Sequence, residues 1–181
     1  MPDPSSPTGV TTPRTVEPAV TIVVADEQSA VPIDADRWAD LARSVLVAEG
    51  CAGELTLTFV DRAEISELNR EHMGIDGPTD VLSFPLDADP HAQTVPGVPV
   101  LLGDVVICPE IAVAAAPEHA GTADDELALL VVHGVLHVLG HDHHEPDETT
   151  RMRAAELDHL IRRQWHGPPP RGFRQVQELR A

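Results

Sequence analysis

The segment HGVLHVLGHDHHE, residues 133–145, directly follows the apolar sequence ADDELALLVV and decides how the chain folds. Together the two segments predict one buried helix over residues 123–139, which Thr122 caps at its start and Gly140 ends. His133 and His137 are four residues apart, so their imidazoles project from one face of that helix about one turn from each other. A rigid, apolar helix with two histidines on one face is therefore the central element of the predicted fold.

The spacing of His133, His137 and His143 predicts a site for one zinc ion. Gly140 ends the helix, and the turn after it can bring His143 back over the same face as a third ligand. Three nitrogen ligands leave a fourth position open for water, as in catalytic rather than structural zinc sites. The alternative is a histidine-rich surface turn that binds metal adventitiously, which the apolar surroundings of the first two histidines disfavour.

The pattern H-x-x-x-H-x-x-G-x-x-H also occurs in a class of zinc peptidases, but their general-base glutamate is replaced here by Gly134. Peptide hydrolysis needs that base for proton transfer, so its absence disfavours proteolysis. RNA cleavage has other demands, because zinc can neutralise charge on a phosphate and the 2′-hydroxyl is an internal nucleophile. The site therefore favours phosphodiester chemistry, with no protein residue assigned to the catalytic step.

The rest of the chain predicts one α+β domain, in which a mixed sheet of about four strands is packed with helices. The strand patterns are AVTIVVAD, ELTLTFV, the strand that follows the Gly-Pro turn of MGIDGPTDVLSFPLD, and VLLGDVVICP. The expected order is β-α-β-α-β-β-α-α-α, with the second helix over residues 62–72 (RAEISELNREH) and the last helix over roughly Asp147 to Trp165. Residues 1–18 are Pro-, Ser- and Thr-rich and are assigned to a disordered tail, residues 19–166 to the domain and residues 167–181 to a C-terminal tail.

The net charge of −18 argues against a nucleic-acid partner unless a local basic groove exists. All 12 basic residues are Arg, and most of them follow residue 150. These arginines either line a phosphate path or merely solvate a helix. No apolar run reaches the roughly 20 residues of a membrane helix, and the N-terminus lacks an apolar signal core. We therefore expect a cytoplasmic protein without membrane contact.

Three motifs resemble the YbeY family of endoribonucleases, which are bacterial rRNA maturation factors. HGVLHVLGHDH is similar to the family pattern H-G-x-L-H-L-x-G-Y-D-H, and DGPTDVLSFP and LGDVVIC resemble its second and third signatures. The resemblance covers roughly Val20 to Trp165. It implies an α+β domain with a zincin-like metal-binding helix, and one zinc ion held by His133, His137 and His143.

The resemblance also implies hydrolysis of single-stranded RNA. The expected setting is rRNA processing, notably at the 3′ end of 16S rRNA, together with ribosome quality control. Small-subunit ribosomal proteins and an assembly GTPase are the partners that the resemblance implies.

Two positions depart from the family pattern. His141 stands where the family usually has Tyr, which leaves the ligands intact. Met73 stands where many members have an Arg that is thought to serve RNA cleavage, so that role is not transferred. Arg70, one helical turn earlier, is a candidate substitute unless it simply faces solvent. Glu126, two turns before His133, is a second candidate, although an acid near a helix N-terminus is also typical.

Two other functions stay open. A metallopeptidase-type hydrolase is supported by the ligand spacing and opposed by Gly134, whereas a non-catalytic ribosome-assembly factor with structural zinc is supported by Met73 and the acidic charge. In the second motif, Thr79, Asp80 and Ser83 either border the metal site or belong only to a core strand and its turn.

Overall fold

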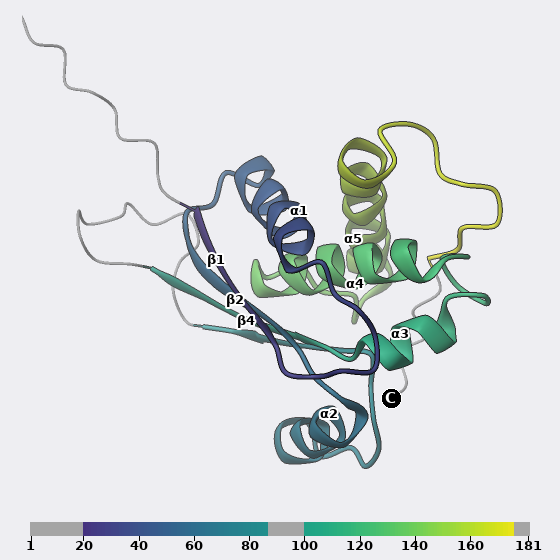
Figure 1. Cartoon of the computed structure of the whole chain (residues 1–181). Helices are drawn as coiled ribbons and strands as arrows, with labels where there is room; N and C mark the ends of the chain where they lie inside the picture. Colours follow the sequence, from purple (N-terminus) through teal and green to yellow (C-terminus); the bar gives the residue numbers. More distant parts are fainter. Residues whose placement is uncertain (1–19, 87–99, 176–181) are drawn as a thin grey trace, which may run out of the picture.

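The computed structural model describes residues 20–86 and 100–175, so the predicted tail over residues 1–18 lies outside the described residues (Figure 1). The order of elements is the predicted one. The elements are β1 (Val20–Asp26), α1 (Ala35–Ala48), β2 (Gly53–Phe59), α2 (Arg62–Leu68) with the π-helical turn η1 (Asn69–Met73), β3 (Val81–Pro85), β4 (Leu101–Ile107), α3 (Pro109–Ala115), α4 (Ala123–Val138), and α5 (Pro146–His159) with the π-helical turn η2 (Leu160–Gln164).

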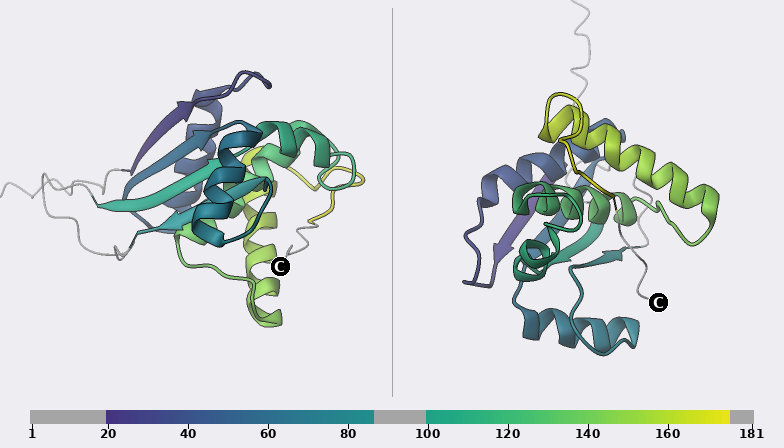
Figure 2. Two further views of the ribbon diagram at one scale, coloured as in Figure 1. Left: turned by 90° about the horizontal axis from the view of Figure 1, so that it is seen from below. Right: turned by 90° about the vertical axis from the view of Figure 1, so that its right-hand side faces the viewer.

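The four strands form one mixed sheet in the order β1-β2-β4-β3. β1, β2 and β4 are parallel, and β3 runs antiparallel to β4 at the edge of the sheet. Helices α1, α4 and α5 lie over one face of this sheet and α2 lies on the other (Figures 1 and 2). This arrangement confirms the predicted α+β class and the predicted four-stranded mixed sheet.

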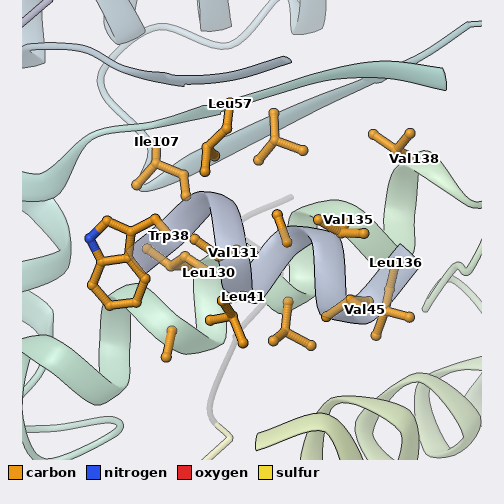
Figure 3. Packing of buried hydrophobic residues seen from close by; sticks show 14 of the residues in the cluster. Trp38, Leu41, Val45, Leu57, Ile107, Leu130, Val131, Val135, Leu136 and Val138 are labelled. Atoms are coloured by element: carbon orange, nitrogen blue, oxygen red, sulfur yellow. The ribbon is translucent and has the colours of Figure 1, made fainter. Parts of the chain in front are cut away.

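The main core lies between the sheet and the layer of α1 and α4. Trp38 and Val45 of α1 meet Leu130 and Val135 of α4 beneath the strand residue Leu57 (Figure 3). Burial of each such side chain contributes about 1.5–3 kcal/mol relative to exposure. α4 is buried along almost its whole length, so most of its side chains are packed by neighbouring elements.

The predicted caps of α4 are present. The Oγ1 atom of Thr122 accepts a hydrogen bond from the Asp125 N–H at 3.1 Å. At the other end Gly140 has φ +89°, and the N–H of His141 donates to the Leu136 carbonyl at 3.0 Å. A glycine in the left-handed region lets the chain reverse after a helix at no steric cost. The chain therefore turns back toward the helix where the sequence indicated.

Two predicted helices do not stay α-helical to their expected ends, because each changes to a π-helical turn. The helix expected over residues 62–72 changes to the π-helical turn η1 after Leu68, where the Asn69 side chain donates to the Gly77 carbonyl at 2.9 Å. The last helix changes to η2 after His159. Asn69 contacts a residue eight positions later, and η2 packs on α1 and α4. These contacts are not local, so the spacing of apolar residues did not reveal the changes.

The segment after η2 contacts the domain, although we assigned residues 167–181 to a tail. Phe173 packs against the core with its ring centroid 4.7 Å from that of Trp165. The N–H of Arg174 donates to the His119 carbonyl at 3.0 Å. The boundary at residue 166 stays a prediction, but the domain contacts extend beyond it. Within residues 20–86 and 100–175, no helix has the length and hydropathy needed to cross a membrane.

Candidate metal centre

The structure brings the three predicted ligands together at the C-terminal end of α4. His133 and His137 lie one turn apart on α4, and His143 returns from the loop that follows Gly140. One candidate ligand atom from each histidine lies within 4.8 Å of the other two, so the group could hold a metal ion. His133 is buried and the other two are half-buried. Solvent therefore reaches His137 and His143 more than His133.

Two of the imidazoles are held in the neutral form that metal binding requires. Burial, with the neighbouring His133 and His143 acting in the same direction, lowers the pKa of His137 to about 4. Burial also lowers the pKa of His143, with His133 contributing in the same direction. Near neutral pH both rings therefore offer nitrogen lone pairs without first losing a proton.

A buried carboxylate, which the sequence analysis missed, contacts the first histidine. The Oε1 atom of Glu156 on α5 lies 2.7 Å from His133 Nδ1, and both side chains are buried. A proton on Nδ1 donates to the carboxylate and leaves Nε2 free for a metal. The available signal was the spacing of Met152, Glu156 and Leu160, which places an acid in the inward stripe of α5.

The donor set fits zinc. Three imidazole nitrogens are the protein ligands of one class of catalytic zinc site. The Nδ1 atom of His143 is buried and has no hydrogen-bond partner among the described residues. A buried polar atom without a partner is costly, and an ion or an ordered water at the cluster is the kind of partner it lacks.

Gly134 shows why the position after the first histidine carries no glutamate. A Cβ atom at Gly134 would lie 2.5 Å from Val105 Cγ1 and 3.3 Å from Ser83 Oγ. Distances near 2.5 Å are too short for carbon atoms that are not bonded, so α4 packs against β4 in a way that only glycine permits. The space that a peptidase-type base would need is filled by the sheet.

The polar residues of the second motif differ in their positions. The Ser83 hydroxyl donates to the Gly134 carbonyl at 3.3 Å, so Ser83 contacts the ligand helix next to His133. Asp80 accepts from the N–H of the next residue at 2.8 Å and from the Thr79 hydroxyl at 3.2 Å. Thr79 and Asp80 thus make the local contacts of a strand start, whereas Ser83 lies beside the candidate centre.

The two candidate catalytic residues have other contacts. Arg70 is exposed, with its guanidinium 3.8 Å from Glu67. Glu126 is buried, accepts from the Ala120 N–H at 3.1 Å and lies 3.3 Å from His119 Nδ1. Burial raises the pKa of Glu126. Neither residue lines the cavity of about 50 Å³ beside the ligands, whose walls are Leu129, His133, His143, Thr149, Met152, Arg153, Glu156 and Gln175.

The position of Met73 is also defined. Its side chain is 45% exposed at the end of η1. A thioether has neither charge nor a strong hydrogen-bond donor, so Met73 cannot take the role of the Arg that the resemblance places at this position.

Comparisons with known proteins agree with the three motifs. The family model described as Endoribonuclease YbeY matches residues 23–164. The Endoribonuclease YbeY of Salinispora tropica is 43% identical over 145 residues, which cover 76% of this chain and 92% of the relative. That of Thermobifida fusca is 45% identical over 136 residues, covering 74% of this chain and 87% of the relative.

A solved structure is also similar. The solution structure of TM1509 from Thermotoga maritima has a TM-score of 0.56 and 25% sequence identity, covering 81% of this chain and 92% of that chain. The resemblance seen in the motifs is thus confirmed over most of the chain, which belongs to the YbeY endoribonuclease family.

Proposed function

We propose that this protein is a zinc-dependent endoribonuclease that cleaves single-stranded RNA. The observation that carries the proposal is the cluster of His133, His137 and His143 in a chain that matches Endoribonuclease YbeY over residues 23–164. The enzyme would act in rRNA maturation, at the 3′ end of 16S rRNA, and in ribosome quality control in the cytoplasm. Small-subunit ribosomal proteins and an assembly GTPase are its proposed partners.

The proposed ligands of one zinc ion per chain are His133, His137 and His143. When bound, zinc supplies a Lewis acid that stabilises negative charge developing on a phosphate. The protein contributes two imidazoles on a buried helix and a third from the loop that follows it, which reduces the reorganisation that binding requires. The pKa values of His137 and His143 are lowered, so these two rings are neutral near pH 7.

The surroundings of Gly134 support a nuclease over a peptidase. Val105 occupies the space that a glutamate at this position would need. RNA carries its own nucleophile in the 2′-hydroxyl, so an adjacent carboxylate is less necessary for its cleavage than for peptide hydrolysis. Arg70 and Glu126 stay candidates for a catalytic role, and the general base is unassigned.

The test is cleavage of a single-stranded RNA by the purified protein with and without a chelator. We expect cleavage by the wild type, loss of cleavage with chelator, and loss in His137→Ala. His144→Ala is the matched control, because His144 lies on the same turn with a side chain that is 75% exposed. Equal cleavage by the wild type and His137→Ala would contradict a catalytic zinc, and casein hydrolysis would favour the peptidase.

A further inference from the structure

We propose that Glu156 is a positioning residue of the metal centre, which fixes the tautomer and the orientation of His133, and that Gln175 in turn holds Glu156. This inference rests on the proposed zinc site and adds two residues to it. Both residues come from segments that follow the three histidines in the sequence.

The contact between His133 and Glu156 has the properties of an orienting bond. The Nδ1 to Oε1 distance is 2.7 Å, and the two residues are 5% and 3% exposed. A carboxylate this deeply buried destabilises the fold unless its oxygens are paired. Histidine ligands of metals commonly donate their second ring N–H to such a carboxylate, which leaves the other nitrogen aimed at the metal.

The second oxygen of Glu156 is also occupied. Oε2 accepts from the side-chain amide of Gln175 at 3.0 Å, and the same amide donates to the Arg153 carbonyl at 2.7 Å. Gln175 therefore bridges the carboxylate and the backbone of α5. Phe173, two residues before Gln175, packs on Trp165. The segment that supplies this amide is therefore anchored in the core.

A side chain of helix α5 also holds the backbone of His143, the third candidate ligand. The Thr149 hydroxyl donates to the His143 carbonyl at 2.8 Å. The side chains of Thr149 and Glu156 line the same cavity beside His133 and His143. α5 thus contacts two of the three candidate ligands, one at its ring and one at its main chain.

The experiment measures metal affinity in four proteins: the wild type, Glu156→Gln, Gln175→Ala and Asp158→Asn. Asp158 is the matched control, because it is an exposed acid on α5 that pairs with Arg162 at 2.8 Å. Zinc dissociation constants come from competition with a chromophoric chelator. The visible absorption of the Co²⁺-loaded proteins reports the geometry around the ion.

We expect Glu156→Gln to weaken zinc binding by about 10- to 100-fold and to change the Co²⁺ spectrum, because a neutral amide orients the imidazole less strongly. Gln175→Ala should show a smaller loss in the same direction, and Asp158→Asn should match the wild type. Urea unfolding of the metal-free proteins tests whether each variant is folded before metal is added.

The outcomes separate this inference from the proposed function. A wild type that binds no zinc overturns the zinc site itself. If the wild type binds zinc and folded Glu156→Gln has the same dissociation constant and the same Co²⁺ spectrum, the positioning role is wrong. If Glu156→Gln does not fold, Gln175→Ala decides, and an unchanged affinity in that variant overturns the inference.

Discussion

Gly134 allows α4 to lie closer to the sheet than any other residue would. A glycine inside a helix costs about 1 kcal/mol relative to alanine. Here the cost is offset by contact with Val105, which a Cβ atom would meet at 2.5 Å. This close packing also sets how α4, which carries His133 and His137, lies against the sheet. Gly134 therefore both excludes a peptidase-type base and positions the helix that bears the ligands.

Gly134→Ala should therefore lower the free energy of unfolding, on the order of 1 kcal/mol. Overpacking costs about 1–3 kcal/mol, and the better helix propensity of alanine returns about 1 kcal/mol. Urea unfolding of the metal-free protein measures the change.

The double variant Gly134→Ala/Val105→Ala tests the cause. Removing the Val105 methyl groups makes room for the new Cβ, so the two changes together should cost less than the sum of the single variants. Additive costs would contradict the proposed contact.

At the scale of elements, the sequence predicted α4, its caps and the meeting of the three histidines, because these features depend on local spacing. The strands and their order along the chain also followed from local patterns. Glu156 was missed because its role depends on how α5 crosses α4, 23 residues after His133. The contacts of Gln175 were missed for the same reason. The prolines at residues 168–170 indicate that the helix has ended, but not where the following segment packs.

Glu126, at the N-terminal end of α4, should make folding stability depend on pH. Burial raises its pKa in the folded protein, and the nearby Asp80 contributes in the same direction, against hydrogen bonds from Ala120 and His119. Below the unfolded pKa, both states are protonated. As pH rises above that value, the unfolded state loses its proton first, so the free energy of unfolding should fall.

Glu126→Gln should remove this dependence. Urea unfolding from about pH 4.5 to 7.5 should therefore show the free energy of unfolding of the wild type falling relative to that of the variant. Asp124→Asn is the control, because the hydrogen bond from Arg37 lowers the pKa of Asp124. The stability that Asp124 contributes is lost only as pH falls below the pKa that this residue has in the unfolded protein. Between about pH 4.5 and 7.5 the free energy of unfolding of Asp124→Asn should therefore change with pH as that of the wild type does. If the free energy of unfolding has the same pH dependence in the wild type and in Glu126→Gln, Glu126 is not the cause of that dependence.

At the scale of the whole molecule, metal binding and folding should be coupled, because the ligands come from α4 and from the loop that α5 anchors. Zinc at about 100 times its dissociation constant should add about 2.7 kcal/mol to the free energy of unfolding. For a domain of this size the melting temperature should rise on the order of 5–10 °C.

Calorimetry with and without a chelator measures this stabilisation. His137→Ala should lose the response to zinc, whereas His144→Ala should keep it. A rise of equal size in both variants would mean that zinc stabilises the fold from another site.

The net charge of −18 makes the binding of RNA depend on local arginines. Arg153 lines the cavity beside His133 and His143, so it is placed to contact a phosphate near the candidate centre. Arg43 is an exposed residue of α1, which packs on β1 at the sheet edge opposite β3. The two arginines carry the same charge but lie in different surroundings.

We expect Arg153→Gln to weaken single-stranded RNA binding and to reduce the slope of log K against log[salt] by about 0.7, the contribution of one phosphate contact. Arg43→Gln should leave the slope almost unchanged, because Arg43 is not among the residues that line this cavity and only arginines that touch phosphate release counterions. Fluorescence anisotropy on metal-free protein measures binding without cleavage. Equal slopes in both variants would contradict a phosphate contact at Arg153, and a flat response in the wild type would mean that no basic groove binds the RNA.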